Sequence, residues 1–240
     1  MSQSTAKTPE QVQEEQLAYL YTKTFTCPVC EMEFMDFLVR RTRLRQISTD
    51  SDFRTRYHHI DPNLYEILAC NNCGYAAMHS SFSRITPRQQ GMIKEKITPN
   101  HKYVEFNMPL STTDALSRYK MALACVQAIE GKASQKAFLC LKMSWICADI
   151  KDEKNEMALL KHAYSNLKDA FSTETFPLGT MDEPQVKYLI AELARRLGNF
   201  EEALRLISDV VVARGIPDSL KTRAQGLKEL IREEDTSKKI

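Results

Sequence analysis

The sequence predicts an α+β fold, in which a small β-rich module precedes an all-α domain. Residues 21–107 are rich in β-branched and aromatic side chains and in turn formers, which is typical of short strands. After Pro109, apolar residues recur at three- and four-residue spacing, as at Leu189, Leu193 and Leu197. That spacing is typical of amphipathic helices. The change of pattern near Pro109 therefore marks the boundary between the two parts.

Composition and charge narrow the class of protein. The 240 residues are 43% hydrophobic and 27% charged, with a formal net charge of +2, so no overall charge favours nucleic acid or membrane. The polar N-terminus has no apolar stretch of the kind that secretion signals contain. The most apolar stretch, Ala137–Ile150, is interrupted by Lys142 and is too short to span a bilayer. We therefore expect a cytoplasmic protein without a membrane partner, in which thiols stay reduced.

The β-rich module is expected at residues 21–110, after a polar N-terminal arm at residues 1–20. Its expected strands are Tyr21–Thr26, Phe37–Ile47 and Leu64–Ala69. A helix is predicted to begin after Thr86, because Thr86 can cap it, Pro87 suits the first helical position and Gln89 can complete a capping box.

The helical domain is expected at residues 111–235. Glycines at positions 131, 198 and 215 fall where helices are expected to end, since glycine adopts the left-handed conformation common there. The predicted helices are 112–131, 135–150, 153–173, 183–197, 200–214 and 218–233.

Four of the seven cysteines form two Cys-x-x-Cys pairs, which we call knuckles. The first is Cys27-Pro-Val-Cys30 and the second is Cys70-Asn-Asn-Cys73. Two such pairs supply four thiolates, the ligand set that favours a tetrahedral zinc ion. The sequence therefore predicts one metal site at Cys27, Cys30, Cys70 and Cys73, in a zinc-ribbon-like module.

The residue that follows each knuckle bears on its geometry. Gly74 suits a tight turn with positive φ, whereas Glu31 stands at the equivalent place after the first knuckle. The long separation between the knuckles suits a ribbon that carries an inserted hairpin or loop. We expect the strands that precede the two knuckles to pair with each other and so to bring the cysteines together.

Alternatives to a structural zinc site remain open. Iron uses the same four ligands, and four reduced core cysteines without a metal would show the same spacing. A catalytic zinc ion normally keeps an open coordination position, which four cysteines would close, so a structural role is favoured. Cys125, Cys140 and Cys147 lie on predicted helices among apolar residues, and we interpret them as core residues.

Part of the helical domain resembles a tetratricopeptide repeat. In Leu193–Arg205, Gly198 falls in the turn between paired helices, and Ala203 lies where the second helix must approach its neighbour closely. In the preceding hairpin Ala158 stands at the comparable place, although the spacing exceeds the standard period of about 34 residues. A degenerate array of few repeats is therefore predicted, and a generic helical bundle is the alternative.

The chain from about Tyr21 to about Gly215 also resembles a bacterial family known as domain-of-unknown-function family 2225 (DUF2225). The residues that carry the resemblance are Cys27–Cys30, the basic stretch Val39–Arg45, Asp50–Phe53, Tyr57, Asp61–Tyr65 and Cys70–Ala76. The resemblance implies a metal-binding ribbon joined to a repeat-like helical domain. It implies no activity.

Basic residues gather between the knuckles. Residues 38–58 hold six arginines against two aspartates, and we predict that three of the arginines project from one face of a strand. This possible binding surface comprises Arg40, Arg41, Arg43, Arg45, Arg54, Arg56 and Tyr57. A nucleic acid, or the carboxylates or phosphates of another partner, would suit it. The alternative is a solvated strand face whose arginines pair with Asp50, Asp52 and glutamates.

No enzyme motif was found. His58 and His59 lie near Asp61, but neighbouring residues on a strand point to opposite faces and chelate one ion poorly. No nucleotide-binding glycine string or metalloprotease motif occurs, so no catalytic residue is predicted. We expect a non-enzymatic adaptor that binds a protein partner through its helical repeats. A nucleic-acid-associated regulator is the first alternative, and a metal-dependent enzyme is the second.

Overall fold

The computed structural model describes residues 15–106 and 108–238. They form two compact units, which are described separately. Unit 1 comprises the described residues up to Ser48 and Thr55–Glu130, and unit 2 comprises Thr49–Arg54 and the described residues from Gly131 onward. Unit 1 thus runs beyond residue 110 and includes the first helix of the expected helical domain. Most of the predicted N-terminal arm, up to residue 14, lies outside the described residues.

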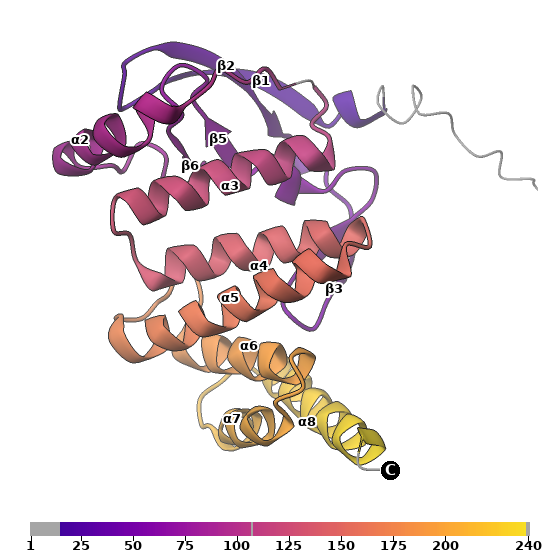
Figure 1. The fold of residues 1–240 in the computed structure, drawn as a ribbon. Coiled ribbons are helices and arrows are strands. Elements are labelled where there is room, and N and C mark those ends of the chain that lie inside the picture. Colours follow the sequence, from indigo (N-terminus) through magenta and orange to yellow (C-terminus); the bar gives the residue numbers. More distant parts are fainter. Residues whose placement is uncertain (1–14, 107, 239–240) are drawn as a thin grey trace, which may run out of the picture. The chain divides into compact units, whose positions relative to one another are not determined.

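Each knuckle in unit 1 closes its own β-hairpin (Figure 1). Strand β1 (Leu20–Thr26) pairs antiparallel with β2 (Glu33–Val39), and β5 (Ile67–Ala69) pairs with β6 (Ala76–Met78). The last paired residues are Thr26 with Glu33 and Ala69 with Ala76, so the two loops have the same length. The expectation that the strands before the two knuckles pair with each other is therefore wrong.

The predicted strand Phe37–Ile47 is wrong as one continuous strand, because only its two ends lie in strands, the first in β2 and the last in β3. β2 ends at Val39, and a hydrogen bond from the Arg43 amide to the Arg40 carbonyl turns the chain into η1 (Arg41–Arg43). This turn lets Leu44 pack against a small apolar cluster in unit 1. The buried members of this cluster are Leu20, Ile60, Tyr65 and Leu110. The chain then enters β3 (Gln46–Thr49), which pairs with β4 (Thr55–Tyr57).

The predicted strand Leu64–Ala69 is correct only in its second half, which is β5. Its first half belongs to η2 (Pro62–Tyr65), because the Asp61 carboxylate caps this turn by accepting from the Asn63 amide. The helix predicted after Thr86 is confirmed as α2 (Pro87–Lys96). The expected capping box is present between Thr86 and Gln89.

The core of unit 1 surrounds the cysteines. Helix α3 (Thr112–Ala128) packs against β5 and β6, and α2 contributes Ile93 to the same core (Figure 1). We call this cluster the knuckle core. Its buried members are Cys27, Val29, Leu38, Leu68, Cys70, Cys73, Tyr75, Phe82, Ile93 and Cys125.

A buried ion pair joins β2 to α3. Arg118 donates from Nη1 to both carboxylate oxygens of Asp36, at 3.0 and 2.8 Å, and to the Ile67 carbonyl at 3.3 Å. Asp36 is 1% exposed and Arg118 is 4% exposed. Burial raises the pKa of Asp36 although Arg118 opposes that shift. The pair therefore fixes how hairpin and helix meet more than it adds net stability.

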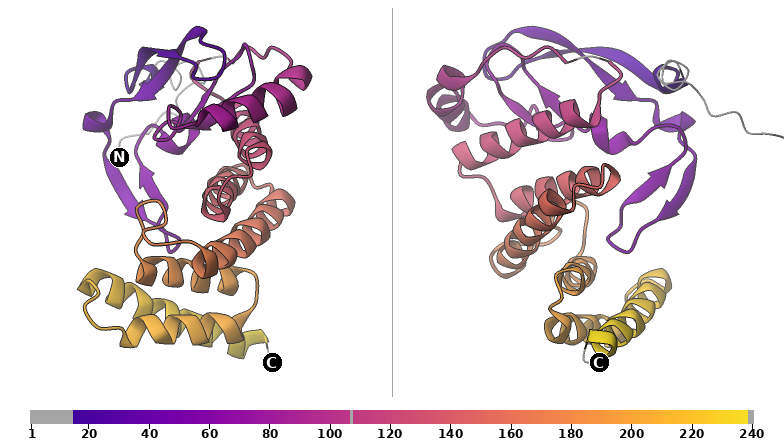
Figure 2. Two further views of the ribbon diagram at one scale, coloured as in Figure 1. Left: turned by 90° about the vertical axis from the view of Figure 1, so that its left-hand side faces the viewer. Right: turned by 45° about the vertical axis from the view of Figure 1, so that its right-hand side comes forward.

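Unit 2 consists of paired helices and the short segment Thr49–Arg54 (Figure 2). The predicted helices are present, and most of their ends differ by only a few residues from the expected ones. The observed helices are α4 (Ala133–Asp149), α5 (Glu153–Thr173), α6 (Glu183–Arg196), α7 (Phe200–Val212) and α8 (Asp218–Lys238).

The turns of the α4–α5 and α6–α7 hairpins share one backbone conformation and one type of helix cap. Lys151 (φ 58°) and Gly198 (φ 79°) take the left-handed position, and the next residues, Asp152 and Asn199, cap the second helices. Ala203 is buried as predicted, but Ala158 is exposed. The expected equivalence of these two alanines is therefore wrong, because α5 turns a different face toward its neighbours.

The ion pair in unit 1 leads to a stability prediction. Arg118→Met should lower the free energy of unfolding by about 3–5 kcal/mol, because it leaves the Asp36 carboxylate buried without its cation. Adding Asp36→Asn should recover part of the loss, since no unpaired charge then remains. Urea unfolding of both variants checks this, and an Arg118→Met protein as stable as the wild type would contradict it.

Candidate metal centre

The four knuckle cysteines converge on one point, as their spacing predicted. Their sulfur atoms all lie within 4.8 Å of one another, and no disulfide joins them. Cys27 and Cys73 are 3.6 Å apart from sulfur to sulfur, as are Cys30 and Cys70. Four sulfurs at about 2.3 Å from a tetrahedral ion are about 3.8 Å apart. The cluster could therefore hold one metal ion.

The two knuckles share one backbone geometry. The Glu31 amide donates to the Cys27 carbonyl and the Gly74 amide to the Cys70 carbonyl, each at 2.9 Å. Both amides belong to residues with positive φ, 62° at Glu31 and 77° at Gly74. The sequence comparison of these two positions is thus confirmed: glycine adopts this conformation freely, whereas glutamate adopts it at a cost.

The second knuckle is held by residues that sequence reasoning did not select. His101 Nε2 lies 2.8 Å from the Asn71 carbonyl oxygen, and the Thr98 hydroxyl donates to the Cys73 carbonyl at 3.0 Å. From α3, Cys125 Sγ lies 3.4 Å from the Ala76 amide nitrogen, which donates to it. No local spacing in the sequence pointed to these residues, since each acts from a distant segment.

The other three cysteines are core residues, as interpreted from the sequence. Cys125, Cys140 and Cys147 are all buried. Burial raises the pKa of Cys125 and of Cys140 to about 11, so both thiols stay protonated at neutral pH. Neither thiol is therefore poised to act as a nucleophile.

Hydrogen bonds among the knuckle sulfurs separate their acidities. Hydrogen bonds from Cys27 and Cys73 lower the pKa of the Cys70 thiol. The hydrogen bond to Cys70 raises the pKa of Cys27, and the contact with Cys27 raises that of Cys73. Of these three thiols, Cys70 is therefore the one that loses its proton most readily. A metal ion must displace the protons of its other thiol ligands, so acid opposes loading.

The surroundings of the sulfurs suit a structural ion. Cys27, Cys70 and Cys73 are buried in the knuckle core, and Cys30 is partly buried. Four thiolates complete a tetrahedral shell, whereas catalytic sites usually combine three protein ligands with water. This donor set can anchor two loops to each other, and it provides no position for a substrate.

Comparison with known families identifies the chain. Residues 20–236 match the family model described as "Uncharacterized protein conserved in bacteria (DUF2225)". The chain belongs to this family. The match covers both knuckles and nearly all of the helical part of unit 2. None of the curated proteins and none of the solved structures matches the chain.

The arginines predicted as one surface fall into two environments. Arg40, Arg41, Arg43 and Arg45 are exposed in or beside η1, while Arg56 and Tyr57 are partly buried. Arg54 is 3% exposed and forms an ion pair with Asp149, so it does not belong to an exposed surface. The predicted alternation along one strand is wrong, because η1 interrupts that strand.

The adjacent histidines do not form a second cluster of ligands in the part of the chain that the structure describes. His59 Nδ1 lies 2.8 Å from a Glu15 carboxylate oxygen, and its ring stacks on Tyr19.

No helix among the described residues is both long and apolar enough to cross a membrane.

The left-handed positions lead to a matched pair of variants. Gly74→Ala should destabilise the metal-loaded protein by at least about 1–2 kcal/mol, because alanine resists this φ. Its Cβ would also lie 2.7 Å from Cγ and Nδ1 of His101. Glu31→Gly, at the equivalent position, should leave stability unchanged or raise it. Urea midpoints of the two zinc-loaded variants check this, and equal losses would contradict the assignment.

Proposed function

We propose that the knuckle sulfurs bind a zinc ion whose role is structural. The observation that supports this is the convergence of four cysteine sulfurs inside an apolar core. Zinc favours four-thiolate tetrahedral sites, and cytoplasmic thiols stay reduced enough to form one. Iron suits the same ligands and is the alternative that metal analysis distinguishes.

We further propose that the protein is a non-enzymatic adaptor and that it binds a protein partner through unit 2. Because four cysteine ligands leave no open coordination position on the metal ion, we propose that the protein acts by recognising a partner at its surface. Stacked helical hairpins present extended surfaces for partners. Unit 2 also exposes several large apolar side chains, namely Ile150, Met157, Val212 and Leu230.

Metal analysis joined to partner capture tests this function. The intact protein should carry one zinc ion with four sulfur ligands by X-ray absorption, and Cys70→Ser with Cys73→Ser should carry none. The intact protein should also retain the same protein in repeated captures at moderate salt. A matched Arg41→Gln, Arg43→Gln, Arg45→Gln variant should retain it too, because unit 2 is unchanged.

Each half of the proposal can fail separately. An intact, folded protein without metal would overturn the structural zinc site. Repeated captures that recover no specific protein would overturn the adaptor function, whatever the metal content.

A second candidate function is favoured by the arginines of unit 1. Arg40, Arg41, Arg43 and Arg45 are exposed, and the Asp52 expected to neutralise them is buried beside Trp145 and Arg196 instead. Arg40 also lies over the exposed Tyr21 ring, with 5.4 Å from Cζ to the ring centroid. An arginine cluster with an accessible aromatic ring suits a nucleic acid.

Salt dependence tests this second candidate. If nucleic acid binds here, replacing Arg41, Arg43 and Arg45 with glutamine should weaken binding and reduce the slope of log K against log salt by about two to three. Fluorescence anisotropy with DNA and RNA pools at several salt concentrations measures this. Absence of binding to every pool at low salt would overturn the candidate, and Lys221→Gln on α8 serves as a control for the loss of one positive charge outside unit 1.

A further inference from the structure

The segment Thr49–Arg54 belongs to unit 2 although it is remote in sequence from the helices of that unit. The chain leaves unit 1 after Ser48 and returns to it at Thr55, so these six residues are anchored in unit 1 at both ends. They form the tip between β3 and β4, and we call them the tip. Hydrogen bonds from Asp50 N to the Arg54 carbonyl and from Phe53 N to the Asp50 carbonyl shape it.

The charged side chains of the tip point into unit 2. The Asp52 carboxylate accepts from Trp145 Nε1 at 2.7 Å and from Arg196 Nη1 at 2.9 Å. Arg54 donates to the Trp145 carbonyl at 2.9 Å and to both carboxylate oxygens of Asp149. Asp52 and Arg54 are each less than 5% exposed. The tip thus offers one anion and one cation to complementary groups.

The neighbouring residues of the tip extend this contact. The Ser51 hydroxyl donates to Glu192 at 2.7 Å, and Glu192 is fully buried. The ring of Phe53 lies 4.9 Å from that of Tyr188, measured between centroids. Arg223 lies over the Phe53 ring, with 5.8 Å from Cζ to the ring centroid, and donates to the Asp50 carbonyl at 3.2 Å.

The groups that receive the tip come from alternate helices. Trp145 and Asp149 belong to α4, Tyr188, Glu192 and Arg196 belong to α6, and Arg223 belongs to α8. These helices therefore share one face, which we call the tip groove. Stacked helical hairpins of this kind present extended surfaces to their binding partners. Here the chain itself supplies the segment that occupies this surface.

We propose that the tip groove is a peptide-binding site which the protein fills with its own residues 49–54. A partner would displace the tip with a short segment of the same chemistry, a carboxylate followed by an aromatic residue and an arginine. This inference rests on the proposed binding of a protein partner through unit 2, and it names the site and the segment that the partner presents.

The chemistry of the contact favours exchange over permanent packing. Most of the bonds between tip and groove are polar, and an incoming segment with the same groups would remake each of them. Phe53 in the tip has φ 66°, a left-handed conformation that is strained for a bulky residue. An unconstrained peptide that meets the same groups without this turn would avoid that strain.

The same bonds account for selectivity. Removal of the tip without a replacement would take the Asp52 carboxylate away from Trp145 Nε1 and Arg196 Nη1, which is costly for these partly buried donors, although Arg196 keeps its bond to Glu156. A tethered segment also competes at an effective concentration in the millimolar range. Only a ligand that satisfies the same groups can therefore displace it, and a generic apolar peptide cannot.

A binding experiment on the full-length protein tests the proposal. The probe is a fluorescein-labelled peptide with the sequence of residues 46–57, Gln-Ile-Ser-Thr-Asp-Ser-Asp-Phe-Arg-Thr-Arg-Tyr. Asp52→Ala with Phe53→Ala weakens the tip but leaves the groove intact. This variant should bind the probe at least tenfold more tightly than the wild type. Adding Arg196→Ala should abolish the gain, because Arg196 is the groove cation for Asp52.

Two controls decide between outcomes. A probe carrying the same two alanine substitutions should not bind, and tight binding of this altered probe would overturn the proposal. So would a folded, metal-loaded double variant that binds the original probe no more tightly than the wild type. Because only purified protein and peptide are used, these results are independent of whether a cellular partner is captured.

If the double variant fails to fold, a second measurement on the wild-type protein tests the proposal. Wild-type protein at saturating isotope-labelled probe should show faster hydrogen exchange at the amides of the tip, since their bonds open on displacement. Peptic fragments of the heavy probe differ in mass from those of the protein. Unchanged exchange in the tip at millimolar probe would overturn the proposal.

Discussion

The four-cysteine cluster, clamped by the metal ion that we propose for it, is the constraint on which unit 1 depends. Its described strands form separate two-stranded sheets, and no ladder joins the β1–β2 hairpin to the β5–β6 hairpin. An isolated two-stranded hairpin is marginally stable in water. The sulfurs and the knuckle core together connect these hairpins, and α3 covers them with Arg118, Tyr119 and Cys125 on its buried face. Loss of the clamp would leave the apolar core to hold two short hairpins by itself.

The sequence was most informative where a local rule determines the structure. The helices of unit 2 were predicted closely because their apolar spacing, caps and glycines act within one or two turns. The metal ligands were predicted because two knuckles need only their own spacing to be recognised. Gly74 and Glu31 were compared correctly because each directly follows a knuckle, and the conformation at that position is set by the local turn.

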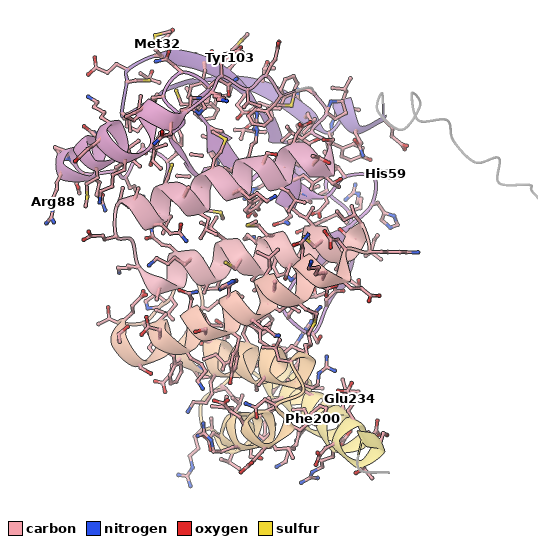
Figure 3. The ribbon with its side chains drawn as sticks, viewed as in Figure 1. Met32, His59, Arg88, Tyr103, Phe200 and Glu234 are labelled. Atoms are coloured by element: carbon pink, nitrogen blue, oxygen red, sulfur yellow. The ribbon has the colours of Figure 1, made fainter. Side chains whose placement is uncertain are left out.

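Predictions failed where a distant contact overrides the local pattern. Residues 37–47 have strand character, but the chain turns after Val39 because Leu44 packs against a remote apolar cluster. Arg54 belongs to a basic stretch in the sequence, yet it is buried against Asp149, which is 95 residues away. Such contacts leave no periodic signal. Figure 3 shows, in contrast, that Met32 and Tyr103 stand at the surface of unit 1, although apolar character alone would place them inside.

The position of the tip in the sequence has a consequence for synthesis of the chain. Asp50 contacts Arg223, which lies 173 residues later. At about 5–20 residues per second, the ribosome needs roughly 9–35 s to make that stretch. Both knuckles are complete long before then, so a nascent chain can close its metal site while the tip still lacks its receiving helices. The receiving groups then arrive in order, those of α4 for Arg54 first, those of α6 for Asp52 and Phe53 next, and Arg223 of α8 last.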